Sequence, residues 1–154
     1  MDVDERKLRT EISDVLGINY LAEATEHDAK RRVDAVDGYW YGRARRAMVP
    51  SVVSNGDGDG KKAYWVHFIV DTDAPSTFLS EGVCEIVGLR KEDSYATIVG
   101  CYLPIRMSPP KSHFSDISIL GVDFCDGLKF TAMYLGNGKM KYLFKDRWNG
   151  MPEP

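Results

Sequence analysis

The stretch "HFIVDTDAPSTFLS", His67 to Ser80, decides the fold of this chain. An apolar, strand-forming run ends at Asp71, and Asp73 follows after one intervening residue in a turn of small residues. Two explanations fit the pattern: the acids lie in a solvated turn, or the strand presents a carboxylate at its end. The chemistry of paired carboxylates and a second segment of the chain favour the latter.

Two carboxylates held face to face share one proton, because like charges about 3 Å apart cannot both ionise. One of them, as a base, activates a water, while the other, as an acid, protonates the carbonyl of the scissile amide. The sequence contains one strand–Asp–Thr–turn element. A pair of such carboxylates therefore needs two chains and a two-fold axis that brings Asp71 next to its symmetry mate.

The segment from Phe68 to Ser80 resembles the active-site segment of the retropepsin-like (retroviral-type) aspartic proteases, whose pattern is apolar–apolar–Asp–Thr–Gly–Ala–x–x–Thr–apolar–apolar. A second segment, "ISILGVDF" from Ile117 to Phe124, is similar to the family segment that packs behind the active-site loop. With the preceding hairpin, the resemblance covers roughly Met48 to Phe144. It implies a mostly β fold, a closed β-barrel (acid protease) domain, which works as a homodimer on extended peptides in retroelements and in cellular proteins.

The same resemblance implies roles for individual residues. Asp71 is the implied catalytic aspartate, Thr72 directs its hydroxyl across the dimer axis, and Ala74 lines the substrate cleft. The remaining members form the active-site loop and its support from below. They are Thr72, Asp73, Ala74 and Thr77 in the loop, and Leu120 and Gly121 in the support. Neither a metal nor a cofactor is implied.

Two departures from the family pattern support a different function on the same fold. Asp73 occupies the position of a glycine, whose backbone freedom and amide matter to the loop. The flap that closes over substrate in the family is short or missing, because only Glu81 to Tyr95 separates the loop from the next strand. The first interpretation is therefore a homodimeric aspartic endopeptidase, and the alternative is a catalytically inactive binding or dimerisation module. A third interpretation is an unrelated β-domain with a plain turn at these acids.

Hydrophobic patterns and turn residues predict the other elements. The expected organisation is an N-terminal helical segment over 1–38, a retropepsin-like domain over 39–146 and a loose tail over 147–154. Inside the domain we expect a hairpin that pairs Met48–Ser54 with Ala63–Val70, a short helix or turn over Phe78–Val87, a β region over Ala96–Met107 and a hairpin turning at Gly136–Gly138.

Composition bounds the partners and the compartment. The 154 residues carry a net charge of −3, so no general basic field attracts nucleic acid or an acidic membrane. The basic cluster at Arg43–Arg46 lies beside aromatic residues but is typical of an edge strand. The expected partners are a second copy of the chain and a peptide substrate. Cys84, Cys101 and Cys125 fit neither a disulfide framework nor a zinc site, which indicates free thiols in a reducing, cytoplasmic setting.

Two further residues have structural explanations. His67 shares a strand face with apolar neighbours, which predicts a packed histidine and not a general base. Asp123 belongs to the second family segment and is expected to cap a turn.

Overall fold

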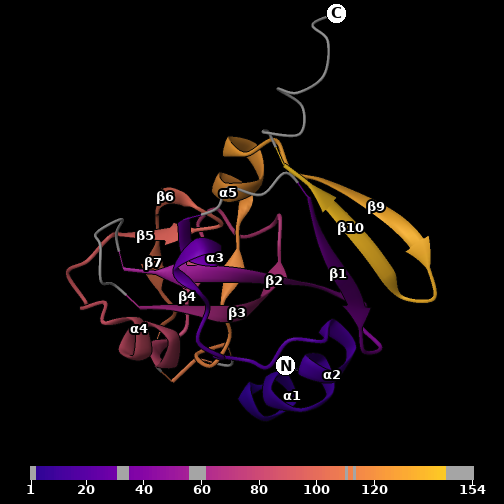
Figure 1. Ribbon diagram of the computed structural model, residues 1–154, viewed down its shortest axis with the longest axis horizontal. Helices are drawn as coiled ribbons and strands as arrows, with labels where there is room; N and C mark the ends of the chain where they lie inside the picture. The colour runs from indigo at the N-terminus through magenta and orange to yellow at the C-terminus, as the bar shows by residue number, and fades with distance from the viewer. Residues whose placement is uncertain (1–2, 31–34, 56–61, 110, 113, 145–154) are drawn as a thin grey trace, which may run out of the picture.

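The structure, a computed structural model, describes residues 3–30, 35–55, 62–109, 111–112 and 114–144 (Figure 1). These residues form a mostly β fold with a 10-stranded sheet and short helices. The helices are α1 Glu5–Arg9, α2 Glu11–Leu16, α3 Glu26–Lys30, α4 Glu81–Val87 and α5 Val122–Gly127. The strands are β1 Ala35–Tyr41, β2 Arg46–Ser54, β3 Ala63–Val70, β4 Phe78–Leu79, β5 Tyr95–Ile98, β6 Cys101–Pro104, β7 Arg106–Met107, β8 Ile119–Leu120, β9 Thr131–Gly136 and β10 Lys139–Leu143.

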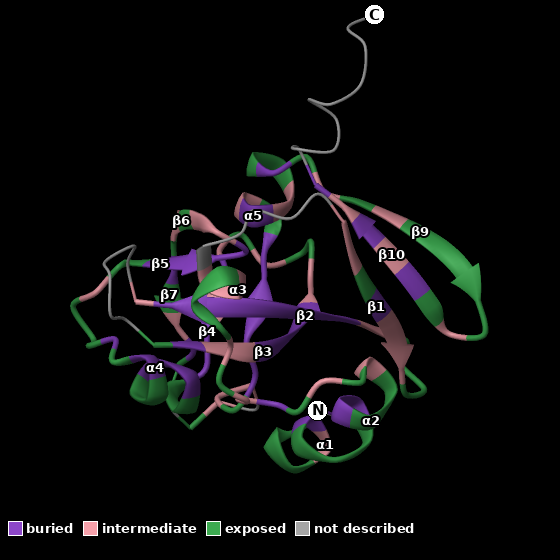
Figure 2. Cartoon of the chain, in the orientation of Figure 1, coloured by how far each residue is buried: buried purple, intermediate pink, exposed green. Residues whose placement is uncertain are grey.

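The hairpin of β2 and β3 is the centre of the sheet. Met48 pairs with Ile69 and Ser54 pairs with Ala63, which confirms the predicted hairpin. Most of both strands is buried, as Figure 2 shows. A strand buried on both faces needs apolar residues at successive positions, which explains the continuous run that precedes Asp71.

Three two-residue strands extend the sheet from the end of β3. β8 runs parallel to β3, with Ile69 opposite Ile119 and Val70 opposite Leu120. β4 runs antiparallel to β8 and parallel to β7. The segment "ISILGVDF" is therefore packed directly against the end of β3, as its resemblance predicted.

The closed barrel that the resemblance implied is not observed. Among the described residues the sheet follows the order β7-β4-β8-β3-β2-β1-β10-β9, and β5 and β6 branch from β2. β7 and β9 end the path without pairing with each other, so the sheet stays open. The hairpin of β9 and β10 extends outward from the body of the molecule (Figure 1) instead of folding back to close it.

The N-terminal segment is less helical than its sequence suggests. Leu8 of α1 and Ile12 of α2 are fully buried in the core, as their helical spacing predicts. However, β1 begins at Ala35, inside the segment expected to be helical, and pairs with β10. Gly38 suits this strand because a Cβ there would lie 2.3 Å from the Tyr142 ring. Tertiary pairing thus overrides the helical composition.

The second half of the domain contains the expected elements with some differences. The predicted short helix or turn over Phe78–Val87 is confirmed in part: Glu81–Val87 form α4, whose first turn is capped by Ser80, while Phe78–Leu79 form β4. The predicted β region over Ala96–Met107 is split, because Val99 and Gly100 both have positive φ and turn β5 into β6. The C-terminal hairpin is confirmed as β9 and β10. The predicted tail over 147–154 lies outside the described residues.

Candidate active site

The parallel pairing of β3 with β8 fixes the position of Asp71. The backbone N–H of Asp71 donates to the Leu120 carbonyl at 3.0 Å, directly after the last paired residue of β3. The Asp71 side chain is half-buried at the start of the turn. The strand therefore does present a carboxylate at its end, at the edge of the buried core.

The turn after Asp71 folds back onto its own carboxylate. The backbone N–H of Asp73 donates to Asp71 Oδ1 at 3.0 Å, and the N–H of Ala74 donates to the Asp71 carbonyl at 3.1 Å. Asp73 is exposed and is not among the residues with positive φ. The conformation of this turn therefore does not require glycine, and the amide at position 73 still reaches the carboxylate. Thr72 is exposed as well.

Thr77 and Asp123 join the loop to α5. The Thr77 hydroxyl donates to Asp123 Oδ1 at 2.8 Å and accepts the Gly121 N–H at 3.1 Å. The Thr77 N–H donates to Asp123 Oδ2 at 3.2 Å. Since Thr77 is only 1% exposed, these bonds are shielded from water. Asp123 was expected to cap a turn, and the structure instead bonds its carboxylate across to Thr77 of the loop.

Gly121 allows the two segments to approach each other closely. A Cβ at this position would lie 2.2 Å from the Ser76 carbonyl oxygen and 2.8 Å from the Ala74 carbonyl oxygen. The next residue, Val122, donates its N–H to that same Ala74 carbonyl at 2.8 Å. Leu120 is fully buried beneath the loop. The structure therefore brings the sequence-predicted support residues to the loop.

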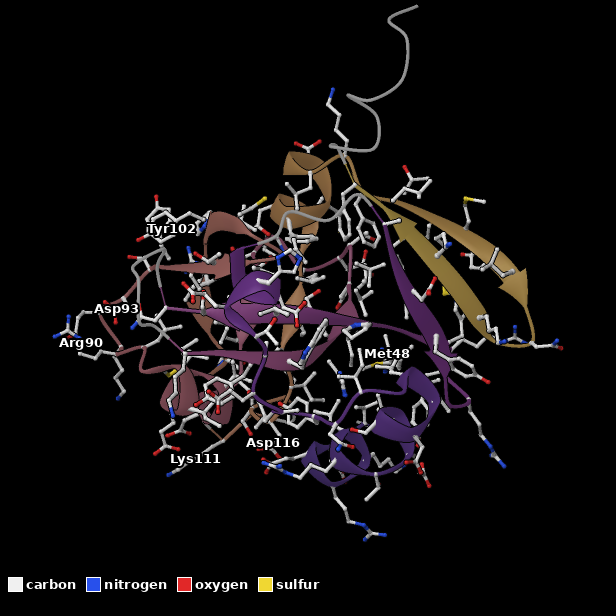
Figure 3. The ribbon with its side chains drawn as sticks, viewed as in Figure 1. Met48, Arg90, Asp93, Tyr102, Lys111 and Asp116 are labelled. Atoms are coloured by element: carbon white, nitrogen blue, oxygen red, sulfur yellow. The ribbon has the colours of Figure 1, made fainter. Side chains whose placement is uncertain are left out.

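A cleft of about 1020 Å³ lies beside the loop. Pro75, Ser76 and Phe78 line one side, and the 91–95 segment and Arg106 also contribute. This segment belongs to a charged turn in which the Arg90 N–H donates to Asp93 Oδ2 at 2.7 Å (Figure 3). No strand occurs in residues 81–94, so the part of the chain where the family flap was expected is a helix and a short turn.

The side chain of His67 is packed against the N-terminal segment. It is fully buried, and its Nε2 lies 2.9 Å from the Ile18 carbonyl and 3.3 Å from Ser13 Oγ. Its Nδ1 is buried without a hydrogen-bond partner among the described residues. Burial lowers the pKa of His67 to about 4, since desolvation disfavours the imidazolium. His67 is therefore a packed histidine that holds the N-terminal segment against β3.

Two serines contribute to the site without having been foreseen. Ser118 is buried, and its hydroxyl accepts the Ser80 N–H at 3.0 Å. Ser108 is also buried, and its hydroxyl donates to the Ile117 carbonyl at 3.0 Å. The sequence carries a signal for Ser118, which lies inside the otherwise apolar "ISIL", because a buried hydroxyl must find a hydrogen-bond partner.

Among the residues that the structure describes, the remaining cysteines and titratable groups form no second centre. Cys84 is buried and Cys101 and Cys125 are half-buried, all three as free thiols. Burial raises the pKa of Cys84 and of Cys125 to about 11, which keeps both thiols protonated. Within the described ranges no group of three or more His, Cys, Asp or Glu side chains could hold a metal ion. None of the described helices is long and apolar enough to span a membrane.

Comparisons with known proteins find a solved structure whose fold is similar to that of this chain. No protein-family model and no curated protein sequence matches this chain. Among solved structures, the chain is similar to the crystal structure of a retropepsin-like aspartic protease from Rickettsia conorii. The sequence identity is 15%, the TM-score is 0.43, and the similarity covers 71% of this chain and 90% of that one. A similarity at this level does not bear on activity.

Proposed function

We propose that this chain is a homodimeric retropepsin-like aspartic endopeptidase. The observation that carries the proposal is the Asp71 carboxylate at the end of a buried strand, with the Asp73 amide donating to it. A backbone donor at this position fixes the orientation of the carboxylate at the end of the strand. Asp71 is half-buried, so part of the residue is exposed to solvent, from which a substrate and a second chain would approach it.

In the proposed reaction, the two Asp71 carboxylates of a dimer hold one proton between them. The ionised carboxylate removes a proton from a water, which attacks the carbonyl carbon of the scissile amide. The protonated carboxyl donates its proton to the carbonyl oxygen, which gives a neutral gem-diol intermediate. The carboxyl that gained the proton of the water then donates a proton to the amide nitrogen, the other carboxylate takes a proton from one hydroxyl of the diol, and the C–N bond breaks. The amine and the carboxylic acid leave, and the pair again holds one proton. The pair titrates as a unit, so cleavage should be fastest in mildly acidic solution.

The remaining residues of the loop would position these groups. Thr77 and Asp123 hold the loop on α5, which keeps Asp71 from moving with the exposed turn. The exposed Thr72 hydroxyl is available to the partner loop across the axis. The cleft beside Pro75 and Ser76 is large enough for several side chains of an extended peptide.

The direct test is cleavage of an unstructured peptide library from about pH 4 to 7, at high protein concentration, because general acid–base catalysis by carboxyls depends on pH. The parent chain is compared with Asp71→Asn, which keeps the shape of the side chain and removes its charge. We expect cleavage by the parent and at least a loss of about 10³-fold in the variant. Equal cleavage by both proteins would exclude Asp71 as the catalytic group.

A second candidate, an inactive binding or dimerisation module, is favoured by one observation. The exposed Asp73 places another carboxylate beside Asp71, so a dimer would collect four acids near its axis. Asp73→Gly separates the two candidates, since it removes the extra charge. Cleavage by Asp73→Gly, with none by the parent or by Asp71→Asn, would mean that the chain has the fold of the enzyme and is inactive because of Asp73. If the parent cleaves, the module is ruled out.

A further inference from the structure

The basic cluster at Arg43–Arg46 lies between two inner strands of the sheet and not on an edge strand. β1 pairs with β10 on one side and with β2 on the other, and β2 pairs in turn with β3. The cluster belongs to the turn between β1 and β2, where the Arg45 N–H donates to the Gly42 carbonyl at 3.1 Å. Protection of an edge strand, which the sequence suggested, therefore does not account for these arginines.

This turn and the neighbouring β9–β10 hairpin form a local region of positive charge. Residues 39–47 and 131–143 contain no aspartate or glutamate, although the whole chain has a net charge of −3. Their cations are Arg43, Arg45, Arg46, Lys139 and Lys141. Lys141 pairs with Asp37 at 3.7 Å, whereas Arg43, Arg45 and Lys139 are exposed and form no ion pair with any described residue. This part of the surface therefore attracts an anionic partner.

A cavity of about 630 Å³ lies in the same region, and its walls include two aromatic rings. Trp40 of β1 and Tyr134 of β9 meet edge to face, with ring centroids 5.0 Å apart. The guanidinium of Arg45 lies over the Trp40 ring, 5.8 Å from its centroid. Lys139 and Asn137 also line the cavity. Aromatic surface, two cations and one amide thus meet in a cavity of the size that ligands occupy.

Packing holds these groups in place without a ligand. The Trp40 N–H donates to the Gly138 carbonyl at 2.8 Å, which joins β1 to the turn of the hairpin. A Cβ at Gly138 would lie 2.7 Å from Cζ of Tyr39, so the glycine lets this turn pack closely on the ring. Stacking on Trp40 orients Arg45, and a stacked guanidinium can still donate its N–H groups in its own plane. Tyr134 is 70% exposed, which makes its ring accessible.

We propose that this cavity binds an unpaired base of a single-stranded nucleic acid, with the neighbouring phosphates on the cations. A base has a flat π face that stacks on an exposed aromatic ring such as Tyr134, and this contact tolerates any base sequence. Arg45 and Lys139 would donate charge-assisted hydrogen bonds to phosphate oxygens. The Asn137 amide carries both a donor and an acceptor for the edge of the base.

The same features separate a nucleic acid strand from other anionic partners. The carboxylates of an acidic peptide would pair with the cations but offer no flat ring to the aromatic cavity. A membrane surface takes up apolar side chains, whereas this hairpin turns at Gly136, Asn137 and Gly138. A free nucleoside phosphate is typically held at a helix N-terminus, and residues 39–47 and 131–143 contain only strands and turns. Cations on two separate segments suit the successive phosphates of a strand.

The test is the fluorescence anisotropy of a labelled single-stranded oligodeoxyadenylate of about ten nucleotides, titrated with the full chain at several salt concentrations. We expect saturable binding that weakens as the salt concentration rises. The same strand annealed to its complement should bind about tenfold more weakly, because its bases are stacked inside the duplex and cannot enter the cavity.

Two variants test the aromatic and the cationic parts separately. Tyr134→Ala should weaken binding about tenfold, because the base loses its stacking contact. Lys139→Gln should reduce the slope of log affinity against log salt by about 0.7, since one counterion fewer is released. The matched controls are Tyr102→Ala and Arg90→Gln, because both residues are exposed and lie away from the hairpin (Figure 3). They should change the affinity less than twofold.

Several outcomes would overturn the proposal. Duplex binding as tight as single-strand binding, or a Tyr134→Ala variant with the affinity of the parent, would mean that no base enters the cavity. Displacement of the strand by an equal concentration of adenosine monophosphate would assign the cavity to a free nucleotide. Tighter binding of a polyglutamate peptide or of phosphatidylserine vesicles at the same salt would assign the surface to another anionic partner.

This inference does not rest on the proposed peptidase activity, because none of its residues belongs to the Asp71 loop. Asp71→Asn should bind the oligonucleotide as the parent does. Loss of cleavage in that variant therefore leaves the inference standing, and failure to bind the oligonucleotide leaves the chemistry of Asp71 to its own assay.

Discussion

Gly121 shows at the scale of one residue how tightly the active-site loop and its support are packed. The Cβ of any other residue would lie 2.2 Å from the Ser76 carbonyl oxygen, closer than real atoms approach. The obstacle is backbone, which cannot rotate away as a flexible side chain can. The glycine is therefore required by space between two chain segments and not by a left-handed conformation, since its own φ is −89°.

This packing predicts the effect of a single methyl group. Gly121→Ala should lower the free energy of unfolding by about 3 kcal/mol, because the loop and β8 must separate to admit the Cβ. Gly127→Ala is the matched control in the same helix region, since a Cβ at Gly127 meets nothing within 4 Å. It should be neutral or stabilising by up to about 1 kcal/mol. Urea unfolding of the three proteins measures both changes, and equal stabilities would show that the loop does not pack on Gly121.

Asp73 was identified from the sequence as a departure from the family pattern, but whether the turn accepts a residue other than glycine depends on its geometry. The family pattern requires an amide near the catalytic carboxylate, and a side chain at that position was expected to need room. The structure keeps the amide contact at 3.0 Å and turns the side chain to solvent. Whether a residue other than glycine fits a turn depends on its φ, which the identity of the residue alone does not determine.

At the scale of elements, the sequence predicted best where pattern and turn chemistry agree. The β2–β3 hairpin follows from two apolar runs around a turn rich in Gly and Asp, and the pairing of the two strands was confirmed. The turn between β5 and β6 was missed, because Val99 adopts a positive φ that β-branched residues avoid. Its N–H donates to the Val52 carbonyl at 3.2 Å, a contact distant in sequence. Such a tertiary contact leaves no local signal.

The sequence also did not predict that the N-terminal segment packs on β3. This packing buries His67 and makes the stability of the chain depend on pH. His67 has a pKa of about 4 in the folded chain against 6.5 for an ordinary histidine. Between these values the unfolded chain binds a proton that the folded chain does not, so stability is complete above pH 6.5 and falls as the pH is lowered toward 4. The loss from this residue should reach about 3 kcal/mol.

Unfolding of the parent and of His67→Gln between these two pH values checks the effect. The glutamine variant has no titrating group at this position, so its stability should depend less on pH by that amount. His27→Gln is the matched control, because His27 is exposed on α3 and its replacement should leave the pH dependence of the parent intact. The same slope in His67→Gln as in the parent would show that another group is responsible. The comparison also sets the acidic limit for any peptide-cleavage assay.

At the scale of the whole molecule, an open sheet and one Asp–Thr turn per chain leave the proposed chemistry incomplete in a monomer. The sequence predicted that incompleteness, since a carboxylate pair built from a single candidate loop per chain requires a second copy. It could not establish which strands end the sheet, because strands distant in the sequence pair with one another, as β1 does with β10. The order of strands is set by long-range packing, which the local pattern of apolar and turn residues does not predict.

Shared catalysis makes a prediction that distinguishes a dyad from a single acting carboxylate. Adding a ninefold excess of Asp71→Asn to the parent chain should reduce parent cleavage to about a tenth under dimeric conditions, because most parent chains then pair with an inactive partner. The control is the double variant Asp71→Asn with Tyr102→Lys. It should inhibit equally, because Tyr102 is an exposed residue of β6 and not part of the Asp71 loop. Undiminished cleavage in the mixture would mean that each Asp71 acts alone, which would refute the shared proton while leaving the catalytic role of that residue to the single-variant assay.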